Sequence, residues 1–103
     1  MRIVLHREAD REFTEAAQYY EYQRSGLGTD FIAAVDEAMA DLEQFPWRWR
    51  VIEDDVRRGL LRRFPYAFYY WEKIPGEELE ILSLVHSKRH PLHWQSRHEG
   101  RED

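Results

Sequence analysis

The segment from 66 to 71 is the part of the sequence that most restricts the fold. In an extended strand, successive side chains point to opposite faces. This alternation places Tyr66, Phe68 and Tyr70 on one face and Ala67, Tyr69 and Trp71 on the other. Both faces are apolar or aromatic, which is typical of a strand covered on both sides. The sequence therefore predicts a central strand at this position.

An arginine-rich strand precedes it. Residues 56–63 contain four arginines within seven positions. Pro65 marks the break between the two strands, because it has no backbone donor and favours an extended residue before it. Alternation places Arg58 and Arg62 on one face with Leu60, and Arg57 and Arg63 on the other with Leu61. Two explanations stay open: an edge strand whose charges prevent edge-to-edge pairing, or a functional surface.

Two amphipathic helices are expected before these strands. From Glu8 the apolar residues follow a helical period, and Ser25-Gly26 ends it, because glycine accepts the left-handed conformation at a helix C-terminus. Thr29 or Asp30 is the predicted N-cap of the second helix, which Pro46 ends. The predicted buried faces are Ala9, Phe13, Ala16, Ala17 and Tyr20, then Phe31, Val35, Ala38, Leu42 and Phe45. A short connection predicts an antiparallel hairpin that covers one face of a sheet.

The remaining strands lie towards the two ends of the chain. Ile3-Val4-Leu5 is a short apolar run that must pair with a segment distant in sequence. Ile74-Pro75-Gly76-Glu77 fits a type II turn and leads into a last strand. Alternation in that strand places Leu79, Ile81, Ser83 and Val85 on one face and Leu82 and Leu84 on the other. The alternation of aromatic and basic residues at 47–52 also indicates a short extended segment or strand near residue 50.

The order of these elements predicts a small α+β domain. It consists of an antiparallel-rich sheet of about four strands, with an N-terminal two-helix hairpin packed on one face. We expect a single domain over residues 1–96 and a polar C-terminal tail over residues 97–103. From Gln95 onward the chain is polar and is expected to fray.

Composition narrows the class of protein. The net charge is −5 and only two of the fifteen basic residues, Lys73 and Lys88, are lysine, so the chain is a poor general binder of nucleic acid. The absence of cysteine excludes disulfides and cysteine-based metal sites, and fits a reducing compartment. No apolar run is long enough to span a membrane, and the N-terminal run is too short for a signal peptide. We therefore expect a cytoplasmic protein that does not associate with a membrane.

An ordered set of short motifs extends from the first strand to Trp94. The set comprises Tyr19-Tyr20-Glu21, Gly26-Leu27-Gly28 with Phe31, Phe45-Pro46, Val56-Arg57-Arg58, Arg63-Phe64-Pro65-Tyr66 with Tyr70, and His86-Ser87-Lys88-Arg89-His90-Pro91 with Trp94. In this order and spacing the chain resembles the RelE/ParE superfamily of bacterial toxins from type II toxin–antitoxin systems, on the ParE-like side (the plasmid stabilisation proteins). The resemblance implies the fold of that family and a cognate antitoxin that wraps and neutralises the toxin in a hetero-oligomer.

The resemblance implies one of two ways to inhibit growth. ParE-like members poison DNA gyrase, which requires only a protein-binding surface; Arg and Tyr are frequent hot spots in such surfaces. The candidates for contacts with the target or the antitoxin are Arg57, Arg58, Arg62, Arg63 and Tyr66. RelE-like members are ribosome-dependent mRNA endonucleases, which need an acid, a base and cations around the phosphate. The candidates for that chemistry are Arg58, Arg62 or Arg63, His86 as acid or base, and Arg89 to position the substrate. The acidic charge and the scarcity of lysine favour gyrase, and enzymatic activity stays open as the alternative.

For several of these residues a purely structural role is the alternative to a functional one. His86 can be a hydrogen-bonded residue at a strand end, and Arg58 or Arg63 can pair with the acidic turn at 53–55. His86, His90 and His93 share a helical spacing, but Pro91 argues against a helix and no carboxylate lies among them, so no metal or cofactor is expected. Trp47-Arg48-Trp49-Arg50 either stacks on a base or closes the end of the core under the arginine stems. Trp94 is expected to seal the sheet.

Overall fold

The computed structural model describes residues 1–89 and 92–98. A β-strand, β1 (Arg2–Leu5), is followed by two helices, α1 (Arg7–Gln23) and α2 (Leu27–Gln44). Four strands then follow, β2 (Val51–Glu53), β3 (Val56–Leu60), β4 (Tyr66–Ile74) and β5 (Glu78–His86), and a 3₁₀ helix, η1 (Leu92–Arg97), comes last. The predicted α+β class is confirmed, with five strands where about four were expected. The fifth is β2, at the position near residue 50.

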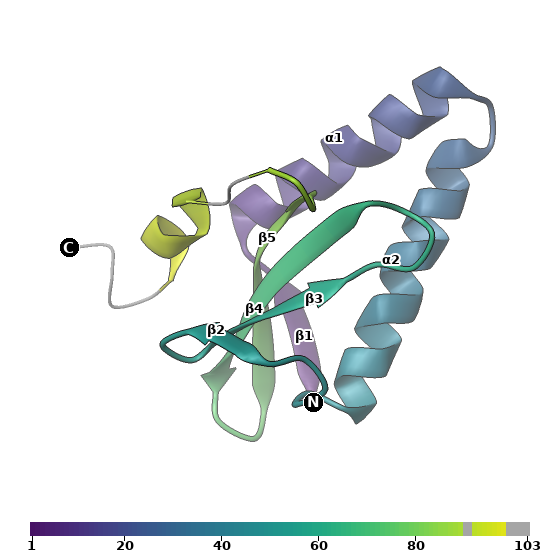
Figure 1. Ribbon diagram of the computed structural model, residues 1–103. Coiled ribbons are helices and arrows are strands. Elements are labelled where there is room, and N and C mark those ends of the chain that lie inside the picture. Colours follow the sequence, from purple (N-terminus) through teal and green to yellow (C-terminus); the bar gives the residue numbers. More distant parts are fainter. Residues whose placement is uncertain (90–91, 99–103) are drawn as a thin grey trace.

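The strands form one sheet in the order β1-β5-β4-β3-β2, as Figure 1 shows. Strand β1 pairs in parallel with β5, and the other neighbours are antiparallel. The first strand thus pairs with a segment distant in sequence, as predicted. Strand β3 lies between β2 and β4, so the explanation of the arginine strand as a sheet edge is wrong. The edge on this side of the sheet is the short strand β2, which the sequence pattern indicates only weakly.

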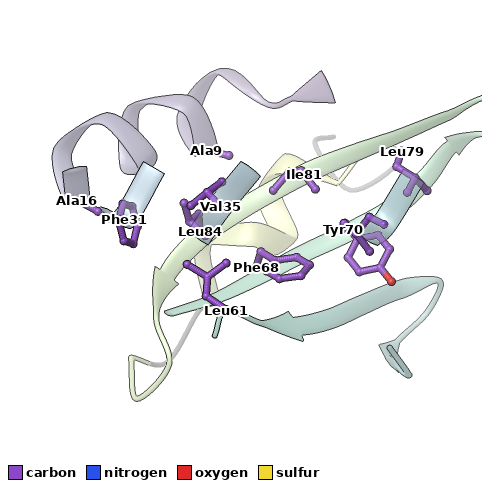
Figure 2. Packing of buried hydrophobic residues seen from close by; sticks show 11 residues of the cluster. Ala9, Ala16, Phe31, Val35, Leu61, Phe68, Tyr70, Leu79, Ile81 and Leu84 are labelled. Atoms are coloured by element: carbon purple, nitrogen blue, oxygen red, sulfur yellow. The ribbon is translucent and has the colours of Figure 1, made fainter. Parts of the chain in front are cut away.

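Strand β4 is central and is buried on both faces, as predicted. Phe68 and Tyr70 face the helices and pack in the larger core, seen in Figure 2. Ala67 and Tyr69 face the other way and pack in a second cluster with Trp94 of η1. Burial raises the pKa of the Tyr70 phenol, whose hydroxyl donates to the carbonyl oxygen of Pro46 at 2.9 Å. The sheet is therefore covered by the helix hairpin on one face and by η1 on the other.

The predicted faces of β5 hold only for its first part. Leu79 and Ile81 face the helices as expected, but Leu84 joins them, while Leu82 and Val85 pack in the opposite cluster. The cause is a break in the pairing register between β4 and β5, where Tyr69 pairs with Ser83 and Tyr70 pairs with Ile81. The residue that is left without a partner shifts the alternation by one position, as a β-bulge does.

The buried face of α1 is confirmed, since Ala9, Ala16, Phe13, Ala17 and Tyr20 all contact the larger core. The predicted N-cap of α2 is wrong. The helix begins at Leu27, with Gly26 at the N-cap position and a φ of 90°. The carboxylate of Glu21 in α1 accepts hydrogen bonds from the backbone nitrogens of Gly26 and Gly28 at 3.0 Å. A side chain from the preceding helix thus satisfies the free amides, which a local N-cap residue would otherwise do.

Gly28 lies where α1 and α2 approach most closely. A Cβ atom at this position would lie 2.7 Å from the carbonyl oxygen of Ala17 and 2.9 Å from Cβ of Glu21. We expect Gly28→Ala to lower the free energy of unfolding by about 1–3 kcal/mol, because overpacking outweighs the gain in helix propensity. Urea unfolding measures this, with the exposed neighbour Thr29→Ala as control. Equal stability of the two variants would show that the helices can separate without loss.

The C-terminal segment differs from the prediction. Trp94 stacks on Tyr69 with ring centroids 5.9 Å apart, so it seals the sheet as expected. However, residues 95–98 do not fray. Arg97 makes an ion pair with Glu12 of α1 at 2.9 Å, and Nε2 of the buried His98 lies 2.9 Å from Oδ1 of Asp55, without the alignment of a hydrogen bond. The ordered part of the chain therefore extends to at least His98, and residues 99–103 lie outside the described part.

Candidate functional site

The two arginines of β3 point to opposite faces of the sheet, and both are half-buried. On the helix side, Arg57 donates to the carbonyl oxygen of Trp49 at 2.6 Å. On the η1 side, Arg58 donates from Nε to the Tyr69 hydroxyl at 2.9 Å and from Nη2 to the carbonyl oxygen of Ser87 at 3.2 Å. Both guanidinium groups are thus committed to contacts within the domain. They are less available to a partner than the sequence alone suggested.

Arg62 and Arg63 lie in the exposed turn between β3 and β4. The predicted alternation over 57–63 is wrong at its end, because β3 stops at Leu60. Leu61 turns into the core, and its amide donates to the carbonyl oxygen of Tyr66 at 3.0 Å. Arg63 has a φ of 69°, a conformation uncommon outside glycine. In the described part of the chain neither guanidinium has an ion pair, and that of Arg63 lies 6.0 Å from the Phe64 ring.

His86 ends β5 and pairs with Tyr66 of β4. The imidazole lies edge-on to the Tyr66 ring at 5.8 Å, and its Nδ1 accepts a hydrogen bond from the Lys88 amide at 3.2 Å. Because Nδ1 accepts, the neutral imidazole carries its proton on Nε2. Burial raises the pKa of the Tyr66 phenol, which keeps it protonated at neutral pH. Both side chains can therefore donate a hydrogen bond.

Tyr66, His86 and Arg89 line one cleft between α1 and the end of β5, with a volume of about 180 Å³. We call it the α1–β5 cleft. Its other lining residues are Glu12, Glu15, Ala16, Tyr19, Leu84 and Val85. The sequence interpretation missed Glu12, Glu15 and Tyr19 as members of this site. Their spacing of three and four residues places them on one stripe of α1, but only the packing of α1 on β5 turns that stripe towards His86.

The nuclease candidates do not come together as one set. His86 and Arg89 lie in the α1–β5 cleft on the helix side of the sheet, while the Arg58 side chain is held on Tyr69 at the opposite face. The turns that carry these residues are nevertheless linked, because the Ser87 amide donates to the carbonyl oxygen of Pro65 at 2.7 Å. The exposed arginine turn at 62–63 and the turn after β5 thus lie at the same end of the sheet.

The Trp47–Arg50 segment supports the core-closing explanation in part. Trp49 packs edge-on against Phe68 at 6.3 Å, and the Arg48 guanidinium lies over the Trp49 ring at 5.8 Å. Trp47, by contrast, is 65% exposed.

His90 and the side chain of His93 lie outside the described residues. Within residues 1–89 and 92–98, no group of three His, Asp or Glu side chains has the arrangement of a metal site.

Comparison with solved structures identifies the architecture. A chain of the chromosomal ParDE TA (toxin–antitoxin) system from P. aeruginosa superposes on this one with a TM-score of 0.70. The match covers 84% of this chain and 95% of that chain, at 18% sequence identity. The chain has a ParE-like fold. The fold expected from the RelE/ParE resemblance is therefore confirmed.

The comparison of structures found this match, whereas comparisons of the sequence found none. No protein-family model matches the sequence, and a search of the curated proteins finds no match either. None of the helices in the described part of the chain combines the length and the apolar character needed to cross a bilayer.

Proposed function

We propose that this protein is the toxin of a bacterial type II toxin–antitoxin system. In this proposal it arrests growth by binding and poisoning DNA gyrase in the cytoplasm, and a cognate antitoxin neutralises it in a hetero-oligomer. The observation that carries the proposal is the ParE-like fold, with its match to a chain of a ParDE TA system over 84% of the sequence. The ordered motifs from the first strand to Trp94 support it independently.

The surface that fits a protein target best is the exposed turn with Arg62 and Arg63. Arginine is among the residues that contribute most to protein interfaces, and these two guanidinium groups have no ion pair in the described part of the chain. Arg57 and Arg58 lie in the strand that leads into this turn, and both donate hydrogen bonds within the domain. We therefore place the direct contacts at Arg62 and Arg63 and assign Arg57 and Arg58 a supporting role.

The geometry favours gyrase inhibition over mRNA cleavage. A nuclease needs its acid or base and its phosphate-stabilising cations around one phosphate. Here His86 and Arg89 share the α1–β5 cleft, but the Arg58 side chain is held on Tyr69 at the opposite face of the sheet, so the full set of candidates does not surround one phosphate. The net charge of −5 further disfavours contacts with many phosphates.

A paired assay on the purified protein tests the proposal. One arm measures supercoiling and DNA cleavage by gyrase, and the other maps mRNA cleavage on translating ribosomes. We expect inhibition of supercoiling with accumulation of cleaved DNA in the first arm, and intact mRNA in the second. Cleavage of mRNA without an effect on gyrase would replace the proposed mechanism by the nuclease alternative. No effect on gyrase and no cleavage of mRNA would refute both mechanisms.

The double variant Arg62→Glu/Arg63→Glu is expected to lose growth arrest on expression in bacteria. If the two arginines include a hot spot worth at least about 2 kcal/mol, gyrase affinity falls at least about thirtyfold. The urea midpoint should stay unchanged, because both side chains are exposed. The matched control is Arg7→Glu/Arg50→Glu, which changes the net charge equally at two other exposed positions. An equal loss of growth arrest in the control would show that the effect comes from net charge alone. Retained toxicity of the Arg62→Glu/Arg63→Glu variant would show that the target-binding surface lies elsewhere.

A further inference from the structure

The α1–β5 cleft presents hydrogen-bond donors from three side chains. Nε2 of His86 is available as a donor, since Nδ1 accepts from the Lys88 amide. The Tyr66 hydroxyl is protonated, and Arg89 is a permanent cation. Arg89 lines the same cleft as Tyr66, and its positive charge opposes in part the rise that burial causes in the Tyr66 pKa. A cleft with this chemistry is suited to an anionic oxygen ligand.

The two carboxylates in the cleft wall are already paired. Glu12 accepts from Arg97 at 2.9 Å and from the Leu84 amide at 3.0 Å. Glu15 accepts from Arg11 at 3.1 Å on the surface of α1. In the described part of the chain, by contrast, the Arg89 guanidinium has no ion pair or hydrogen bond of its own. The unpaired charge in the cleft is therefore positive.

We propose that the α1–β5 cleft binds a single carboxylate side chain of a partner protein, held by Arg89, His86 and Tyr66. One guanidinium with two neutral donors matches one carboxylate in charge and in number of hydrogen bonds. A nucleic-acid strand would bring several phosphates towards Glu12 and Glu15, and the described residues that line the cleft include no further cation to neutralise them. This site is separate from the Arg62–Arg63 turn, so it extends the proposed function without depending on gyrase as the target.

Nuclear magnetic resonance on the isotope-labelled full chain tests the site. The probe is a capped hexaglutamate peptide, and a hexauridylate RNA is the competing ligand. We expect the peptide to shift the signals of the His86 ring, the Tyr66 ring and the Arg89 guanidinium together, with saturation. Arg89→Gln should weaken the affinity for the peptide at least about tenfold, and Tyr66→Phe should weaken it by a smaller factor.

Arg50→Gln is the matched control, because it removes an exposed arginine that directly precedes β2 and is not among the residues that line the cleft. It should leave the affinity for the peptide within a factor of two or so, since only long-range attraction changes. Three results would overturn the proposal: no saturable shift at the three residues, equal weakening by Arg50→Gln and Arg89→Gln, or tighter binding of the RNA than of the peptide in this cleft. Because the probe is a simple peptide, a negative gyrase assay would not affect this result.

Discussion

Arg97→Ala is expected to lower the free energy of unfolding by about 3–5 kcal/mol, the largest polar effect in the molecule. Arg97 donates to both carboxylate oxygens of Glu12, at 3.0 and 2.9 Å, and to the carbonyl oxygen of Leu82 at 2.7 Å. The two side chains are only 9% and 11% exposed. Removing the guanidinium takes the ion pair and two hydrogen bonds from the largely buried Glu12 carboxylate, and it leaves the carbonyl oxygen of Leu82 without that donor.

This network bonds to the backbone of β5 beyond Ile81, where the pairing with β1 ends. The carbonyl oxygen of Leu82 accepts from Arg97, and the amide of Leu84 donates to Glu12, so side chains satisfy backbone groups that no β1 residue reaches. Glu12→Gln in the Arg97→Ala background should restore part of the stability, because a neutral amide still accepts from Leu84 without leaving a charge. Urea unfolding of the single and double variants measures both effects.

The control for this series is Arg11→Ala, which removes an exposed arginine paired with Glu8 and Glu15. Exposed pairs contribute at most about 1 kcal/mol, so this variant should remain close to the wild type. If Arg97→Ala were no more destabilising than Arg11→Ala, the buried pair would not hold η1 on the sheet.

Phe31→Ala is expected to cost about 3–5 kcal/mol, the largest effect of an apolar substitution. Phe31 is fully buried, and its ring lies between 5.1 and 6.1 Å from four other rings. These rings belong to Phe13, Tyr20, Phe64 and Tyr66, so one side chain connects α1, α2 and the end of the sheet. Its removal loses both the buried apolar area and the edge-to-face contacts.

Phe31→Leu should fall between the wild type and Phe31→Ala, because it keeps apolar volume but loses the ring contacts. The neighbouring Ile32→Ala is the control, since Ile32 is 40% exposed. Thermal and urea unfolding should rank the variants in the same order. A small loss for Phe31→Ala would mean that the surrounding rings collapse into the vacated space.

Local patterns in the sequence were sufficient where a single period holds along an element. The stripe Ala9, Phe13, Ala16, Ala17 and Tyr20 predicted the buried face of α1, and the two-sided pattern at 66–71 predicted the central strand. The positive φ of Gly76 and the bond from the Glu77 amide to Ile74 likewise agree with the predicted turn. Each of these features follows from backbone geometry that depends on neighbouring residues alone.

The errors occurred where a distant group completed a local structure. Glu21 caps α2 from the preceding helix, so the chain needs no N-cap at Thr29 or Asp30. A bulge in β5 reverses the expected faces of its last residues, and the side chains of Glu12 and Arg97 bond to the backbone of Leu84 and Leu82 there. The pairing of β3 with β4 ends at Leu60, which moves Arg62 and Arg63 from a strand into an exposed turn.

The sequence by itself determined the class of fold, the central strand and the hairpin, because hydrophobic periodicity is a property of consecutive residues. It also indicated the ParE-like architecture through its ordered motifs. Only the tertiary structure decided which arginines are free, and that His86, Tyr66 and Arg89 share a cleft with α1. The physical reason is that a side chain's partners depend on which segments pack together, and residues from both ends of the chain meet at β5.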